Sequence, residues 1–132
     1  MLESVLIVSV PVSDQEKARD FYVDTLGLEL RADEGWGVGM RLVEVAPKGS
    51  ATSLTLVTWF ESMPPGSLQG FVVATDDIHS THEELAGRGV AFDFPPTEMP
   101  GGTQAVFRDP DGNALMLHHR YAPPEVKPER PS

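Results

Sequence analysis

The amino-acid sequence repeats itself, and this repeat constrains the fold more than any other feature. Asp14 aligns with Asp77, 63 residues further along, and Val10 then meets Val73. In each half an apolar stretch precedes the aspartate, a helical pattern follows it, and a glycine and three further apolar stretches come next. The sequence therefore predicts one βαβββ unit that is used twice.

The first half contains the signals of a strand, a helix and three further strands. Ser13 and Glu16 have the spacing of a capping box, which predicts that Ser13 caps the helix. Gly27 occupies the place of the glycine that commonly ends a helix. The predicted elements are a strand over 4–12, a helix over 13–26, strands over 28–32, 38–46 and 52–60, and turns over 33–37 and 47–51.

The second half follows the same order after a linker that contains Pro-Pro-Gly. Asp109 and Asp111 lie in the string DPDGN, which predicts a hairpin turn in which both aspartates cap the backbone. The predicted elements are a linker over 61–69, a strand over 70–75, a helix over 76–88, a strand over 90–94, a loop over 95–102 and strands over 103–108 and 114–120.

Two such units predict an α+β fold of two βαβββ modules. A helix covers only one face of a small sheet, so we expect a cleft between sheet faces. The open faces and edges of so short a chain predict a homodimer, and the modules can pair within one chain or across the dimer. We expect one domain over 1–122, with repeats over about 1–62 and 68–122, and a Pro-rich flexible tail over 123–132.

Charge and composition exclude several classes of function. Twenty acidic against ten basic residues give a formal charge of −10, which disfavours nucleic acid and anionic membranes and favours a neutral or cationic small molecule. Without cysteine, disulfides, thiolate metal sites and cysteine nucleophiles are excluded. No apolar run approaches the ~20 residues of a membrane-spanning helix. The acidic Glu3 near the start predicts a cytoplasmic protein without a signal peptide.

Three segments resemble the vicinal oxygen chelate superfamily, which contains glyoxalases, bleomycin-resistance proteins and extradiol dioxygenases. The segments are PVSDQEKARDFYVDTLGLEL, VVATDDIHSTHEELAGRGVAF and VFRDPDGNALML, and the resemblance covers about residues 4–120. It implies the two-module fold, a single domain of this superfamily and a small-molecule site. It does not imply one activity, because this superfamily contains lyases, isomerases, dioxygenases, thiol transferases and metal-free binding proteins.

The resemblance also implies where a metal would bind. Superfamily enzymes usually hold a divalent ion with histidine and glutamate, and the matching positions here are Ile7, Gly70 and Met116, with Thr55 as the best match for the remaining one. Isoleucine and glycine side chains offer no ligand, and a thioether is too soft for Mg²⁺ or Mn²⁺. We therefore expect no metal and no other cofactor.

Four histidines leave two other combinations to consider. His118 and His119 are adjacent on a predicted strand and so point to opposite faces. His79 and His82 are three residues apart on a predicted helix and could meet, but that helix is expected on the outside of the sheet.

Alternation along the strands predicts an apolar cleft with few polar groups. Trp36 and Trp59 are candidates for aromatic walls, or equally for ordinary core residues. Met99, in the predicted loop, is expected near the mouth of the cleft. The predicted lining residues are Ile7, Ser9, Trp36, Thr55, Val57, Trp59, Gly70, Val72, Met99, Met116 and His118.

Three functions are compatible with these features. The first is a metal-free binding protein that sequesters a hydrophobic, aromatic or cationic compound, as drug-resistance proteins of this superfamily do. The second is a lyase, isomerase or dioxygenase-related enzyme with a non-standard metal site or none, in which His118 could act as a base; no other catalytic residue is assigned. The third is a structural domain without a ligand. No nucleophile motif, dinucleotide fingerprint or P-loop supports another chemistry.

Overall fold

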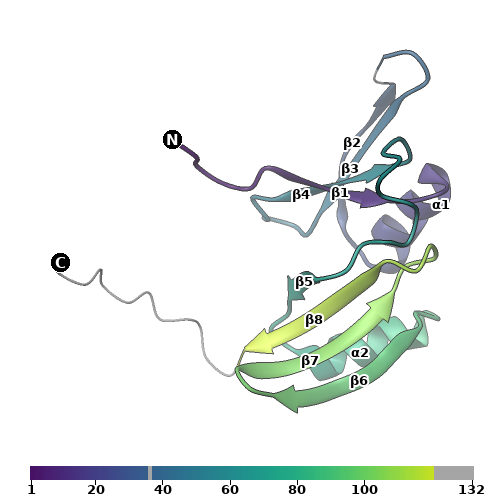
Figure 1. Cartoon of the computed structure of the whole chain (residues 1–132). Coiled ribbons are helices and arrows are strands. Elements are labelled where there is room, and N and C mark those ends of the chain that lie inside the picture. The colour runs from purple at the N-terminus through teal and green to yellow at the C-terminus, as the bar shows by residue number, and fades with distance from the viewer. Residues whose placement is uncertain (36, 121–132) are drawn as a thin grey trace.

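The computed structural model describes residues 1–35 and 37–120 and arranges them as two four-stranded sheets (Figure 1). The first sheet has the strand order β1-β4-β3-β2 and the second β5-β8-β7-β6. In both sheets the outer first strand runs parallel to its neighbour, and the other pairs are antiparallel. The predicted α+β fold of two βαβββ modules is confirmed.

Apart from η1, the two modules contain the same elements in the same order. The first module contains β1 (Ile7–Pro11), α1 (Gln15–Arg19), a π-helical turn η1 (Asp20–Thr25), β2 (Glu29–Gly35), β3 (Arg41–Ala46) and β4 (Ser53–Val57). The second contains β5 (Phe71–Ala74), α2 (Ile78–Gly87), β6 (Phe92–Met99), β7 (Gly102–Arg108) and β8 (Ala114–Arg120). The predicted tail over 123–132 lies outside the described residues. No helix of the described part is long and apolar enough to cross a bilayer.

The first helix begins differently from the prediction. Asp14, and not Ser13, caps it: the Asp14 carboxylate accepts hydrogen bonds from the backbone nitrogens of Glu16 and Lys17, at 2.9 and 3.1 Å. A carboxylate accepts both orphan N–H groups and also favours the positive end of the helix dipole. The Ser13 hydroxyl is therefore free to donate elsewhere, to Asp111 of the second module at 2.6 Å.

The predicted loop over 95–102 is wrong, because β6 continues to Met99 and β7 begins at Gly102. The two strands form a long hairpin in which Met99 lies opposite Gly102. Pro95 and Pro96 fall at a register irregularity of β6, which is the edge strand of its sheet. A proline is tolerated at such a place because its missing N–H leaves no ladder bond unmade. The predicted turn over 33–37 likewise belongs in part to β2.

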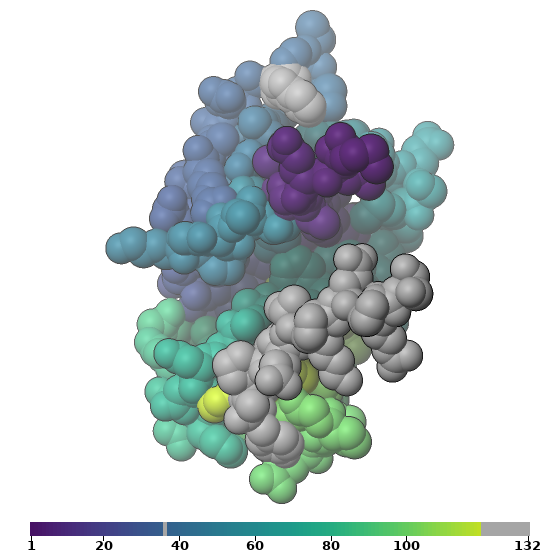
Figure 2. Space-filling view, turned by 90° about the vertical axis from the view of Figure 1, so that its left-hand side faces the viewer, coloured from purple at the N-terminus to yellow at the C-terminus, as the bar shows by residue number. Residues whose placement is uncertain are grey.

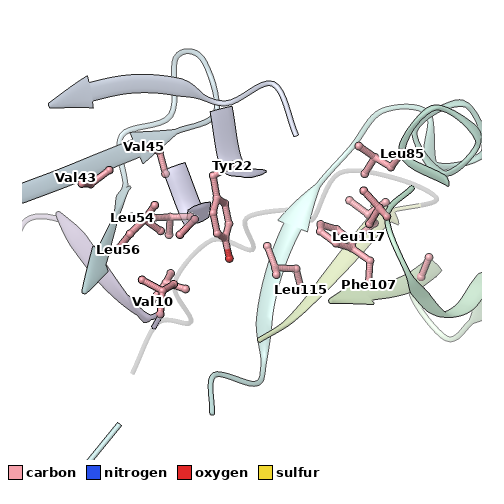
Figure 3. Close-up of a cluster of buried hydrophobic side chains, with 14 of the residues drawn as sticks. Val10, Tyr22, Val43, Val45, Leu54, Leu56, Leu85, Phe107, Leu115 and Leu117 are labelled. Carbon is pink, nitrogen blue, oxygen red and sulfur yellow. The ribbon is translucent and has the colours of Figure 1, made fainter. Parts of the chain in front are cut away.

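The helix-bearing faces of the two sheets share one hydrophobic core (Figure 3). Tyr22, fully buried, lies between the two modules and points from the first module toward Leu115 of the second. Because the helix-bearing faces meet, the opposite sheet faces point away from this core. The buried members are Val10, Val12, Ala18, Tyr22, Val43, Val45, Leu54, Leu56, Ile78, Leu85, Val90, Ala105, Phe107, Leu115 and Leu117.

The DPDGN turn connects the two modules by buried hydrogen bonds. The Asp109 carboxylate accepts one from the Tyr22 hydroxyl at 2.8 Å, and the Asn113 amide donates to the carbonyl oxygen of Pro11 at 2.8 Å. Burial, followed by the charge of Asp109, raises the pKa of Tyr22 above its usual value. Asp109 caps the backbone of the turn as predicted, by accepting from the backbone nitrogens of Asp111 and Asn113.

The carboxylate of Asp111 serves the contact between the modules, and not the turn as predicted. It accepts from both the backbone nitrogen and the hydroxyl of Ser13, at 3.1 and 2.6 Å. The linker approaches the same turn at Gly66, where φ is +83° and a Cβ atom would collide with the carbonyl oxygen of Asp111. Only glycine combines this φ with so close a backbone contact.

Candidate functional site

Each sheet has one face that carries no helix, which we call its open face. Along each strand, side chains point alternately to this open face and to the core. In β1, Val8 and Val10 pack toward the core, whereas Ile7 and Ser9 point to the open side. Cross-strand partners share a face, so the register extends each open face across its sheet. The first open face comprises Ile7, Ser9, Glu44, Ser53, Thr55 and Val57; the second comprises Val72, Ala74, Gln104, Val106, Met116 and His118.

The first open face is polar at its centre. Ser9 and Thr55 lie opposite each other, and their hydroxyls are 3.3 Å apart. Glu44 of β3 is the other cross-strand partner of Thr55, which places a carboxylate on this face. Arg31 donates to the Ser53 hydroxyl at 2.8 Å and thereby occupies one end of the face. Ser53 and Thr55 are themselves buried, with exposed fractions of 4% and 7%, whereas Ser9 and Glu44 are only partly buried. Ser9 and Glu44 are therefore the polar groups here that can orient a ligand by hydrogen bonds.

The second open face is mostly apolar, with one polar pair. Met116 lies between Val72 of β5 and Val106 of β7. Val72, in the edge strand β5, is 55% exposed. His118 lies opposite Gln104, and its Nδ1 is 3.2 Å from the Gln104 amide nitrogen. This combination suits a flat apolar molecule with one hydrogen-bonding group.

The structure distributes the predicted lining residues over several places. Four lie on the first open face, namely Ile7, Ser9, Thr55 and Val57. Three lie on the second open face, namely Val72, Met116 and His118. Gly70 immediately precedes β5, with φ of +77°. Met99 ends β6 and is 41% exposed. Trp36 lies outside the described residues.

Trp59 lies beyond the end of β4, beside Phe60, with the ring centres 6.2 Å apart. Together with Val57, and with Met63 and Pro64 of the linker, it lines a cavity of about 280 Å³. This cavity is separate from the second open face. Trp59 therefore stands apart from Met116 and His118.

Two further cavities follow the seam between the modules. One, of about 390 Å³, lies between Leu28 of the first module and Phe71, Leu85 and Leu117 of the second. The other, of about 660 Å³, lies along β5 and includes Gly70 and Val72. Ser9, Thr55, Met116 and His118 line none of these three cavities. Within one chain the two open faces are thus not joined in one of these cavities (Figure 2 shows the modules as an upper and a lower lobe).

The residues at the positions expected for a metal do not fit a hard divalent ion. Of Ile7, Gly70, Met116 and Thr55, only Thr55 has an oxygen on its side chain, and that hydroxyl faces Ser9. A methionine sulfur is a soft ligand. Across residues 1–35 and 37–120, no three side chains of His, Cys, Asp or Glu are grouped as metal ligands. The expected lack of a metal remains a prediction, supported by the chemistry of these side chains.

The other histidines do not supply a replacement. His119 lies opposite Thr103, on the side of the sheet away from His118. His82 packs its ring edge-on against Phe92, with the ring centres 4.6 Å apart. His79, its candidate partner on α2, is exposed.

The sequence interpretation missed two polar residues of the open faces. Gln104 could have been found from the DPDGN turn, because a hairpin that pairs Arg108 with Ala114 must pair Gln104 with His118 if no bulge intervenes. Glu44 could not have been found in this way. It reaches Thr55 because β3 and β4 are neighbours in a register that their connecting turn does not reveal.

Comparisons with known proteins agree on one group. The model of the family described as Glyoxalase/Bleomycin resistance protein/Dioxygenase superfamily matches residues 4–117. TnmS3, an antibiotic binding protein from Streptomyces sp. CB03234, is 53% identical, with a TM-score of 0.86 over 90% of this chain and 97% of that one. A family member from Sphaerobacter thermophilus DSM 20745 is 41% identical, with a TM-score of 0.85 over 90% and 98%. The uncharacterized protein YetH of Bacillus subtilis (strain 168) is 37% identical over 89% of this chain and 98% of its own length.

Proposed function

The chain belongs to the glyoxalase/bleomycin resistance protein/dioxygenase superfamily, and from this premise we propose that it is a small-molecule-binding protein. It takes up a hydrophobic aromatic compound, neutral or cationic, holds it without a metal and releases it unchanged. The observation that carries this proposal is the chemistry of the open faces. Where superfamily enzymes need metal ligands, this chain has Ile7, Gly70 and Met116, and around Met116 it has further apolar side chains.

Two further facts support a binding protein. TnmS3, which shares 53% of its residues with this chain, is an antibiotic binding protein. The net charge of −10 attracts cations at long range and does not hinder neutral compounds. Residues 1–122 are proposed to act as a single domain, and a cytoplasmic location remains a prediction.

The second candidate is an enzyme of the same superfamily, a lyase, isomerase or dioxygenase-related protein without a standard metal site. The observation in its favour is His118, a histidine on an otherwise apolar open face. Recovery of a changed compound would distinguish it from a binding protein.

A second copy of the chain is proposed to complete the site. β1 and β5 are edge strands, and each carries an exposed apolar residue, Ile7 at 43% and Val72 at 55%. A homodimer with twofold symmetry can bring the first open face of one protomer against the second open face of its partner, twice over. The bound compound would then be enclosed by the polar groups of one face and the apolar residues of the other.

The dimer predicts a molecular mass in solution of twice the 14.4 kDa of the chain. Sedimentation equilibrium at micromolar protein concentration measures it, because apolar exposed edges favour association at such concentrations. A monomer under these conditions would contradict the dimeric site, although not the binding of a ligand to one face.

Binding is tested by equilibrium dialysis with two flat aromatic compounds of similar size: fluorene, a neutral hydrocarbon, and proflavine, a cationic aminoacridine. We expect about one molecule of fluorene or proflavine per protomer in the micromolar range, since apolar area supplies the affinity. Mass spectrometry should recover the compounds unchanged, and a chelator should not alter binding. An unrelated acidic protein of similar charge controls for unspecific uptake of the cation. Failure of both compounds to bind, or their metal-dependent conversion, would contradict the proposed function.

A further inference from the structure

The histidine–glutamine pair on the second open face indicates which ring nitrogen of His118 carries the proton. Nε2 of Gln104 lies 3.2 Å from Nδ1 of His118, across the β7–β8 ladder. A carboxamide nitrogen carries two hydrogens and has no free electron pair to offer, so with the carboxamide in this orientation Nδ1 of His118 is the acceptor. A neutral imidazole that accepts at Nδ1 carries its proton on Nε2.

The second ring nitrogen of His118 is available to a ligand. Among the described residues it has no hydrogen-bond partner, and every buried side-chain nitrogen or oxygen of that part of the chain has one. His118 as a whole is half-buried, so its ring is not sealed in the core. Nε2 lies against Gly102, where a Cβ atom would be only 3.1 Å from it and would collide with the carbonyl oxygen of His119.

The apolar surroundings make this N–H a selective group. On the second open face His118 follows Met116 at a spacing of two residues, and Met116 lies between Val72 and Val106. An aromatic body that covers these three side chains displaces water from the neighbourhood of Nε2. An N–H that loses water without gaining another acceptor costs free energy, so a ligand with an oxygen at this point is favoured over one without.

Building on the proposed function, we propose that His118 donates from Nε2 to a carbonyl-type oxygen of the ligand and that the protein thereby prefers aromatic ketones to the corresponding hydrocarbons. Gln104 is a positioning residue, which acts through the tautomer of His118. The same tautomer leaves no electron pair on the exposed Nε2, as a general base would need. The arrangement therefore suits recognition of an acceptor better than proton abstraction.

The preference is measured with a matched pair of compounds, fluorenone and fluorene, which share a three-ring frame and differ by one carbonyl oxygen. The wild-type protein is expected to bind fluorenone roughly 3- to 10-fold more tightly, the net effect of one hydrogen bond. His118→Phe should reduce the ratio of the two affinities to about one, because it removes the N–H that distinguishes the two compounds. His119→Phe is the control, because His119 lies on the opposite face, and it should leave the ratio unchanged.

The tautomer is measured without any ligand, by ¹⁵N spectra of the imidazole nitrogens at pH 9. The wild-type protein should show the proton of His118 on Nε2. In Gln104→Glu, the carboxylate only accepts, so the proton should move to Nδ1 and the preference for fluorenone should be lost. A merely structural role of Gln104 would not move the proton.

Two results would overturn the inference: a proton on Nδ1 in the wild-type protein, or equal ratios in the wild type and in His118→Phe. Failure of fluorene and fluorenone alike to bind would instead contradict the proposed function and, with it, the preference for ketones. In that case the spectra still report the tautomer by themselves, so the two failures can be told apart.

Discussion

Replacement of Asp109 by alanine is expected to lower the free energy of unfolding by about 3–5 kcal/mol. The Asp109 side chain accepts four hydrogen bonds, from the Tyr22 hydroxyl, the Asn113 amide and the backbone nitrogens of Asp111 and Asn113. Tyr22 and Asn113 are fully buried, so their donors would be left without partners and without water. Removal of an acceptor from buried donors is among the most destabilising of single changes.

Urea unfolding, followed by circular dichroism, measures this difference. Asp93→Ala is the matched control: its carboxylate binds Arg108 on the surface, and the unfolding midpoint should hardly change. If both variants unfold at similar urea concentrations, the DPDGN turn does not hold the modules together as the hydrogen bonds indicate. If Asp109→Ala fails to accumulate, Asp109→Asn, which keeps one carbonyl oxygen, provides the intermediate case.

Met116→Glu is expected to weaken the binding of fluorene by at least about 10-fold at pH 7.5, because a carboxylate then lies among Val72 and Val106 where the aromatic body should pack. Burial of a carboxylate raises its pKa above the ordinary value of about 4.3. The neutral acid is the tolerated form. The variant should therefore match the wild type best below that value and lose stability, relative to the wild type, as the pH rises through the raised pKa.

The measurement is dialysis of fluorene at pH 4 and 7.5, together with the melting temperature of both proteins across that range. Val38→Glu is the control for an added charge, because Val38 is 102% exposed and lies in the turn between β2 and β3. A Met116→Glu protein whose stability follows the wild type from acid to neutral pH would show that position 116 faces water. The apolar residues around Met116 would then not shield a carboxylate enough to raise its pKa. Neither result depends on a metal, since a single carboxylate supplies too few ligands to hold one.

Local signals in the sequence were sufficient for the fold. The 63-residue repeat from Asp14 to Asp77 predicted two βαβββ modules, and Gly27 and the DPDGN turn marked the end of a helix and a hairpin. These features depend on residues close together along the chain: on alternation, on helix ends and on the few residues that accept a turn's backbone angles. The same alternation separated Ile7 and Met116 from the core residues beside them.

Some local sequence signals were compatible with two structures, and only tertiary packing decided between them. Ser13 has the spacing of a helix cap, but Asp14 caps the helix and Ser13 binds Asp111, nearly a hundred residues away. Two prolines predicted a loop at 95–102, but an edge strand accepts them. Trp59 was expected beside the ligand, and the strand that would carry it there ends at Val57. In each case the sequence allows two local structures, and contacts with distant residues select one.

The sequence by itself determined the two modules, the alternation of their strands and the lack of metal-ligating side chains at Ile7, Gly70 and Met116, because these are properties of short segments. Only the tertiary structure decided that the helix-bearing faces share one core around Tyr22 and that Glu44 meets Thr55. Such pairings depend on strand register and on how two finished sheets pack. Neither is encoded in any one segment, since both arise from the balance of contacts over the whole chain.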